Sequence, residues 1–209
     1  MCRLSTSFVT LFFLVFLLAG TQRSRAQIGV AVGLNYESVS DLDVGNFTAT
    51  YEAAGGYHAG LFYDLSLGSV GLRLGAFYRD LGDIESESDL NIAEEVENFD
   101  LTMLDFPVDI RLNLTTTPLI HPYLLFGPVF SVPSSGVDFI DKNLESLLVT
   151  GNIGIGLALN IAGISLFPEF RYAIGITRLL KDRIEIGGVE VKTEVQRVNS
   201  AMLRIGVIL

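Results

Sequence analysis

Apolar and polar residues alternate along the stretch LDFPVDIRLNL, residues 104–114. Leu104 and Phe106 fall on one side of the alternation, and Asp105 and Asp109 fall on the other. Successive side chains of a strand point to opposite faces. The pattern therefore predicts a β-strand with one apolar and one charged face. What each face touches decides where the protein resides.

The same alternation recurs in eight segments, and no helical period occurs after residue 27. We expect strands at residues 28–37, 57–67, 70–80, 101–114, 121–131, 147–161, 164–176 and 198–209. Short links at 68–69, 115–118 and 162–163 alternate with long links at 38–56, 81–100, 132–146 and 177–197. This asymmetry is typical of outer-membrane barrels, which have short periplasmic turns and long outer loops. The sequence predicts an all-β fold, an eight-stranded antiparallel transmembrane β-barrel with up-and-down meander topology.

The two faces of the predicted strands differ in charge. One face has no charged residue in any strand, whereas the other has five acidic residues and five arginines. The charged positions are Glu37, Asp64, Arg73, Arg79, Asp105, Asp109, Arg111, Glu169, Arg171 and Arg204. Most other positions on that face are glycine, alanine or asparagine, which would leave room for large charged side chains in a narrow lumen. The segment 121–131 is apolar on both faces and cannot be assigned in this way.

Alternation alone would also fit a soluble barrel whose apolar face points inward. A soluble exterior should be rich in lysine, yet Lys142, Lys181 and Lys192 all fall in predicted loops. Turning the strands inside out would place the arginines toward lipid, at a cost of up to roughly 2–4 kcal/mol each at the midplane. We therefore expect the apolar face to contact lipid and the charged face to line the lumen.

Three tyrosines support this orientation. Tyr36, Tyr57 and Tyr78 lie on the apolar face, each at the end of a predicted strand next to a long loop. Aromatic rings with a polar tip prefer the interface between lipid and water. We expect these residues to form an interfacial belt on the side of the long loops.

The first 26 residues are predicted to be a signal peptide that precedes a single barrel domain at 27–209. An uncharged apolar run of 13 residues extends from Phe8 to Gly20, and Ser24-Arg25-Ala26 offers a small-x-small cleavage site. The run is shorter than the roughly 20 residues that a membrane-spanning helix needs. Cys2 is the only cysteine and would leave with the signal, so the mature chain would have no disulfide.

The mature chain would be strongly acidic. Residues 1–26 carry three arginines and no acidic residue, which leaves 11 basic against 24 acidic residues and a formal charge of −13. This balance argues against nucleic acid as a partner. Residues 83–97 hold seven acidic and no basic side chains, and we considered divalent cations or a basic partner for this segment. We favour a solvated loop, because the spacing does not match an EF-hand. We expect no metal site and no cofactor.

Four segments resemble the PorT-like outer-membrane β-barrel family that is common in Bacteroidota. They are Leu104-Asp105-Phe106-Pro107-Val108, residues 121–128 (HPYLLFGP), residues 151–157 (GNIGIGL) and residues 168–177 (PEFRYAIGIT). The resemblance implies an eight-stranded barrel in the bacterial outer membrane from about residue 28 to the end. It also implies a link to protein secretion, because the name-giving member is associated with a secretion system for surface-exported proteins. No catalytic residue carries over. The chain departs from such barrels by ending in Leu209 instead of an aromatic residue.

The charged lumen residues allow two interpretations. The first is a structural ion-pair network, because buried charges need partners and the two signs are equal in number. The second is a path for ions or protons. We favour the network, since an eight-stranded interior has room for little besides side chains.

Three functions remain open from the sequence. We favour a non-enzymatic, monomeric outer-membrane protein with a structural or interaction role through its loops and rim, as an accessory to protein secretion. Its partners would be outer-membrane lipid and envelope or secretion-system proteins. The second function is a small passive pore. The third is a lipid-modifying enzyme centred on His58, with Glu37, Ser38 and Ser40 nearby in sequence. His121, next to Pro122 beside a short turn, is expected to be structural.

Overall fold

The computed structural model describes residues 25–39, 42–44, 47–51, 54–88, 98–114, 120–161, 163–181, 183–186, 189–192 and 197–209. The long strands are β1 (Arg25–Val39), β4 (Ala54–Leu67), β5 (Val70–Ser88), β6 (Asn98–Asn113), β7 (Ile120–Ser135), β8 (Leu148–Ile161), β9 (Ile164–Gly175) and β12 (Val198–Ile208). The links between them contain β2 (Leu42–Val44), β3 (Phe47–Tyr51), α2 (Asp138–Asn143), β10 (Arg183–Ile186) and β11 (Val189–Lys192).

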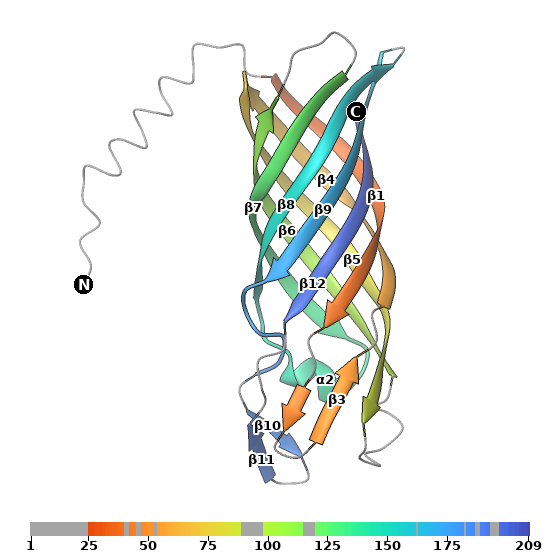
Figure 1. The fold of residues 1–209 in the computed structure, drawn as a ribbon, viewed down its shortest axis with the longest axis vertical. Helices are drawn as coiled ribbons and strands as arrows, with labels where there is room; N and C mark the ends of the chain where they lie inside the picture. Colours follow the sequence, from red (N-terminus) through yellow and green to blue (C-terminus); the bar gives the residue numbers. More distant parts are fainter. Residues whose placement is uncertain are drawn as a thin grey trace, which may run out of the picture.

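The long strands form a closed barrel (Figure 1). Each pairs antiparallel with the long strand that follows it in the chain, and β1 pairs with β12 to close the sheet. The predicted eight-stranded antiparallel meander barrel is thus confirmed. In Figure 1 the short-turn end, which also holds the C-terminus, is at the top, and the long links are at the bottom.

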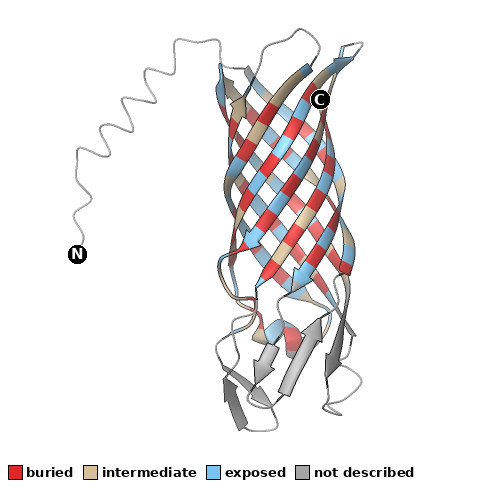
Figure 2. Cartoon of the chain, viewed as in Figure 1, coloured by how far each residue is buried: buried red, intermediate tan, exposed pale blue. Residues whose placement is uncertain are grey.

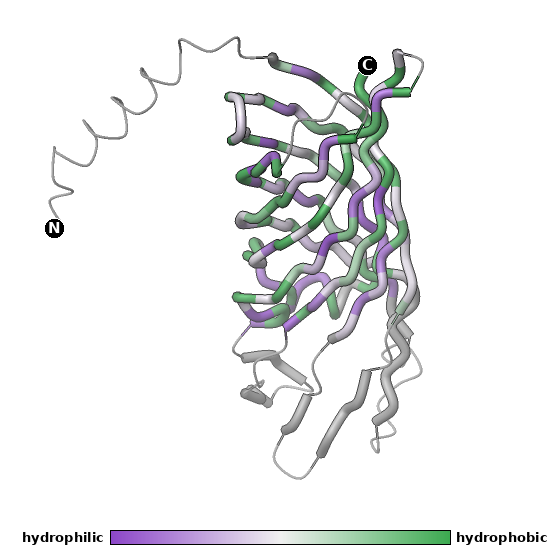
Figure 3. Tube along the Cα trace, turned by 45° about the horizontal axis from the view of Figure 1, so that its top comes forward, coloured by the Kyte–Doolittle hydropathy of each residue, from purple (hydrophilic) through white to green (hydrophobic). Residues whose placement is uncertain are grey.

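Burial alternates residue by residue along the barrel strands (Figure 2). The hydropathy of the same strands alternates with it (Figure 3). The outward positions expose large apolar side chains from every strand, among them Leu34, Leu61, Leu74, Phe106, Phe126, Ile155, Phe170 and Leu203. Such a continuous apolar exterior would be costly in water and suits a lipid bilayer. No helix within the described ranges is long and apolar enough to cross a membrane.

The strand β7, whose faces could not be assigned from the sequence, is resolved by the structure. Tyr123, Leu125 and Val129 point inward and are buried, whereas Phe126 and Phe130 are exposed on the outer surface. The strand is apolar on both faces because its outward side chains lie on the barrel exterior and its inward side chains pack against others in the lumen.

Several strands extend beyond their predicted ends on the long-link side. We expected the third strand to end at residue 80, but β5 continues to Ser88 after a register shift between Asp80 and Asp83. Leu81, within the shift, faces the interior, so an apolar residue follows Arg79 on the charged face and the alternation no longer marks the strand. The helix α2 and the strands β2, β3, β10 and β11 were likewise not predicted, because elements of three to six residues are too short to show a period.

The lumen is closed on the long-link side by an apolar cluster that we call the cap. Inward side chains of the barrel, such as Leu81, Leu101 and Leu148, pack against Ile140 of α2 and against Leu179. Backbone hydrogen bonds tie the covering segments together: Glu145 N–H donates to Leu179 O (2.9 Å) and Lys181 N–H donates to Asn143 O (2.9 Å). The cap thus places α2 across this mouth of the barrel (Figure 1).

Candidate functional site in the barrel lumen

All ten charged residues that we expected on the inner face are buried in the lumen. They divide into two connected groups along the barrel. The outer group lies next to the cap and centres on Arg79. The inner group lies farther from the cap and centres on Arg73, Arg171 and Glu169.

The outer group joins β1, β5 and β6 through one guanidinium. Arg79 Nη1 lies 3.0 Å from Glu37 Oε1, and Arg79 Nε lies 2.7 Å from Asp105 Oδ2. Ser200 of β12 also donates to Glu37, and Arg79 donates to the Ser200 hydroxyl at 2.6 Å. One cation therefore faces two carboxylates in this group.

The inner group is a continuous chain of ion pairs. Arg171 lies 2.9 Å from Glu169 and 2.8 Å from Asp109. Arg73 pairs with both Glu169 and Asp64. Arg111, in turn, pairs with Asp64. Each carboxylate thus has at least one guanidinium partner, which is what burial of charge requires.

Neutral side chains complete the inner group. Tyr123 donates a hydrogen bond to Glu169 Oε1 (2.7 Å), and Asn152 donates to Asp109 Oδ1 (2.8 Å). Together these contacts connect β4, β5, β6, β7, β8 and β9 across the middle of the barrel. The arrangement fixes the lumen side chains and holds strands on opposite walls to each other.

Arg204 is the exception among the lumen arginines, because it makes no ion pair with a carboxylate in the described part of the chain. Its Nε instead donates to His58 Nε2 at 3.1 Å, and its guanidinium lies 3.8 Å from the centre of the Phe77 ring. Asn35 fixes the tautomer of His58. The Asn35 amide nitrogen donates to Glu37 and to Asp80 O, so its oxygen faces His58 Nδ1 at 3.2 Å and accepts from it.

His58 is accordingly a neutral connector between the two groups. Its Nδ1–H donates to Asn35 and its Nε2 accepts from Arg204, so neither nitrogen is free, and its side chain is 1% exposed. The residues of the enzyme hypothesis are not brought together. Glu37 binds Arg79, and Ser38 points outward, onto the opposite face from Glu37. Ser40 lies outside the described residues.

Four inward aromatic side chains were missed by the sequence analysis: Phe62, Phe77, Tyr123 and Phe167. They lie against the arginines, with the Arg111 guanidinium 4.1 Å from the Tyr123 ring centre and the Arg73 guanidinium 4.6 Å from that of Phe62. Cation–π contact of this kind stabilises a guanidinium away from water. Their alternate positions along the strands could have revealed them, because Phe77 lies an even number of residues from Arg73 and Arg79 and therefore shares their face.

Glycines on the inner face leave the space that these large side chains occupy. A Cβ atom at Gly156 would overlap the Tyr123 ring, and one at Gly75 would lie 2.6 Å from the Phe77 ring. At Gly154 it would lie 3.0 Å from Arg171 Cγ. Lumen glycines and bulky lumen residues are therefore complementary in space.

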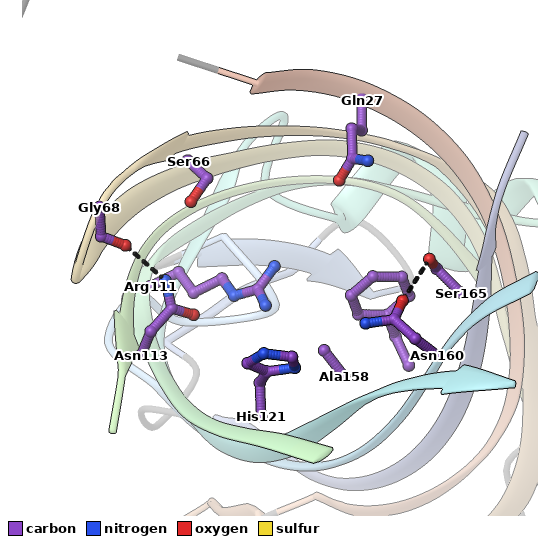
Figure 4. A pocket seen from close by; sticks show the side chains of 10 residues that line it. Gln27, Ser66, Gly68, Arg111, Asn113, His121, Ala158, Asn160 and Ser165 are labelled. Atoms are coloured by element: carbon purple, nitrogen blue, oxygen red, sulfur yellow. Dashed lines mark hydrogen bonds between the residues drawn. The ribbon is translucent and has the colours of Figure 1, made fainter. Parts of the chain in front are cut away.

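The lumen is hollow toward the short turns. A cavity of about 310 Å³ opens there, and its lining includes Arg111, Ala158 and Phe167. Figure 4 shows it from close by. We expected the interior to hold only side chains, and that expectation is wrong at this end. His121, which we expected to be structural, contributes to the lining.

The remaining predicted features lie at or beyond the edge of the described structure. Tyr36, Tyr57 and Tyr78 are exposed on the outer surface, and the rings of Tyr57 and Tyr78 lie 6.3 Å apart. Of the acidic segment 83–97, residues 89–97 and all the side chains lie outside the description, as do residues 1–24 of the predicted signal peptide. The residues described here contain no group of three side chains suited to a metal ion.

Comparison with known proteins supports the fold and no narrower assignment. No protein-family model matches the chain, and no curated protein matches it, so the resemblance to PorT-like barrels is not established. Among solved structures, the chain is similar to Neisserial surface protein A (NspA), at 12% identity and a TM-score of 0.52 over 88% of this chain and 98% of that one.

Two further structures align over a similar extent. The outer membrane protein AlkL, solved in DMPC lipid bilayers, has 12% identity and a TM-score of 0.49 over 88% of this chain and 90% of AlkL. Ail of Yersinia pestis, solved in complex with the heparin analogue sucrose octasulfate, has 12% identity and a TM-score of 0.44 over 88% of this chain and 99% of Ail. At such identities the likeness is one of fold.

Proposed function

We propose that this chain is a non-enzymatic, non-conducting barrel of the bacterial outer membrane that acts through its long-link end. The observation that carries the proposal is the filled lumen. Between the cavity and the long-link mouth lie the inner group, the outer group and the cap, and the large side chains in each are buried. Water and ions would have to displace several charge-paired side chains to pass.

Membrane insertion follows from the exterior. Apolar side chains cover the outer surface of the barrel, and its ten lumen charges point away from that surface. The outer membrane is the membrane in which barrels of this kind reside. Export would require the predicted signal at 1–26, and the C-terminus and short turns would then face the periplasm.

The long-link end is the part best suited to interactions. The strands β5 and β6 remain paired past the register shift, with Asp83 opposite Asp100, and β3 pairs with the end of β5. Since about 9–11 residues suffice to cross the bilayer, the 19-residue β5 projects beyond it. Outer-membrane barrels carry such extensions on the cell surface.

Single-channel recording tests the non-conducting state and the pore alternative. We expect the purified barrel in a planar bilayer to give no conductance steps above the bare bilayer, with an outer-membrane porin as the positive control. Regular steps whose ion selectivity changes on Arg79→Gln would favour the pore, because any conducting path would have to pass Arg79.

Photo-crosslinking in cells tests the interaction role. A photo-crosslinking amino acid at Lys142, exposed on α2, should give a discrete adduct with an envelope or surface protein. The same group at Ser69, exposed in a short turn, is the matched control. Adducts from Ser69 alone would contradict a role for the long-link end.

An accessory role in protein secretion is a narrower proposal, supported only by the resemblance of four motifs to PorT-like barrels. Deleting the gene should then reduce the amount of surface-exported protein while the outer membrane stays intact. Unchanged export would remove this role and leave the general interaction role in place.

A further inference from the structure

The cavity at the short-turn end is open, whereas the middle of the lumen is filled by the side chains of the inner and outer groups. Its volume is about 310 Å³, at the lower end of the roughly 300–1,000 Å³ of small-molecule sites. Its polar side chains are those of Gln27, Ser66, Arg111, Asn113, His121, Asn160 and Ser165 (Figure 4). Among the described residues that line it, none is acidic.

Arg111 is the cationic residue of this lining. The residue is 7% exposed, and its guanidinium carbon lies 4.1 Å from the centre of the Tyr123 ring. Nη1 pairs with Asp64, but Nε is buried without a hydrogen-bond partner. In Figure 4 the guanidinium points into the open centre of the cavity.

The negative charge that faces Arg111 is shared. Asp64 Oδ2 pairs with Arg111 and also with Arg73, so one carboxylate oxygen serves two guanidiniums. Counted with Arg204, the inner group has four arginines against three carboxylates, Asp64, Asp109 and Glu169. The middle of the lumen therefore carries one more positive than negative charge, although Arg204 itself does not line the cavity.

The walls add neutral hydrogen-bonding groups around this charge. Ser165 donates to Asn160 Oδ1 at 2.8 Å, which fixes the Asn160 amide and leaves its nitrogen as a donor in the cavity. Asn113 donates to Gly68 O at 2.9 Å, and its oxygen is buried without a partner. An anionic ligand in the cavity would lie next to the Arg111 guanidinium and accept from the Asn160 amide.

We infer that this cavity binds a small oxyanion, a carboxylate or phosphate group, that enters from the short-turn end. A guanidinium presents parallel N–H donors that match the oxygens of either group. The inference rests on the barrel fold and not on the proposed role of the long-link end, because the cavity lies at the opposite mouth.

NMR titration of the isotope-labelled barrel in detergent tests the inference directly. Inorganic phosphate and acetate are the two probes, added separately at constant ionic strength with chloride as the balancing anion. We expect saturable shifts of the Arg111 Nε–H signal and of the Asn113 and Asn160 side-chain amides. Saturation by phosphate alone assigns phosphate-bearing ligands, and saturation by acetate alone assigns carboxylates.

Two variants separate a site from general surface charge. Asn160→Asp keeps the acceptor for Ser165 but adds a negative charge inside the cavity, so affinity should fall about tenfold. Ser69→Asp adds the same charge at the same end, outside the lining, and should change affinity less than about twofold. Ala158→Leu, which fills the cavity without changing charge, should abolish binding.

Two results would overturn the inference. One is the absence of saturable shifts with both probes in a barrel that is folded by its NMR spectrum. The other is an equal loss of affinity in Asn160→Asp and Ser69→Asp, which would mean that the anions respond only to the overall field of the barrel end.

Discussion

The two ends of the lumen differ in the chemistry and the packing of their inward side chains. At the long-link end, Leu81, Leu101 and Leu148 turn inward and pack against Ile140 and Leu179. At the short-turn end seven polar side chains, together with Ala158 and Phe167, surround an open cavity. The barrel thus has a tightly packed apolar cap at one end and an open cavity at the other.

This difference indicates which parts of the lumen hold the fold together. Buried side chains that contact one another across the barrel contribute to its cooperative stability, whereas side chains around a solvated cavity contribute little. Substitutions in the charged groups in the middle should lower the stability most, because water cannot reach a buried charge that has lost its partner.

The largest effect is expected from Glu169→Gln. Glu169 pairs with Arg73 and Arg171 and accepts from Tyr123, so its neutralisation leaves two buried guanidiniums short of a partner. The free energy of unfolding should fall by about 3–5 kcal/mol. Urea unfolding of the refolded barrel, followed by the mobility difference between folded and unfolded forms on a gel, measures it. Asp141→Asn, at an exposed site on α2, is the control and should be near neutral.

The packed end is tested by Leu101→Ala. Leu101 is fully buried in the cap, and its truncation should cost about 2–5 kcal/mol through lost contacts and the space left behind. Leu104→Ala, three residues along β6, is the matched control. Leu104 is 45% exposed on the outer surface, where lipid chains can fill the space, so its loss should be clearly smaller. Equal losses would mean that the cap is not packed.

The complementarity of glycine and bulky residues predicts an intermediate effect for Gly156→Ala. The added methyl group would press on the Tyr123 ring and disturb its hydrogen bond to Glu169, at a cost of about 1–3 kcal/mol. Gly151→Ala on the same strand is the control, because its nearest contact would be an ordinary 3.6 Å from Ile176 Cδ1. Unfolding midpoints in urea compare the two, and a neutral Gly156→Ala would show that the lumen has spare room.

The face of each charged lumen residue could be predicted from the sequence, but its partners could not. A period of two assigns a side chain to the inner or outer face and carries no information about its height in the barrel. Arg204 and Glu169 lie opposite each other on neighbouring strands and yet form no ion pair. Arg73, on a distant strand, pairs with Glu169 instead. These partners depend on strand stagger and on side-chain reach across the lumen.

The cap could not be predicted for a related reason. Leu81 and Leu101 lie on the inner face, where the rest of the strand pattern calls for polar or small residues. Their apolar character makes sense only once α2 and the segment around Leu179 cover that mouth. Because α2 has six residues, no periodicity in the sequence marks it.

The smallest effect is expected at the open mouth, from Asn113→Ala. The substitution removes the hydrogen bond to Gly68 O, worth about 0.5–1.5 kcal/mol, but it also removes a buried oxygen that has no partner. The two changes oppose each other, so the net loss of unfolding free energy should lie near the lower end of that range. The urea midpoint of this variant, read beside that of Leu101→Ala, measures the difference between the two ends. A loss as large as that of Leu101→Ala would mean that the open mouth belongs to the same cooperative packing as the cap, and the contrast between the ends would be one of polarity alone.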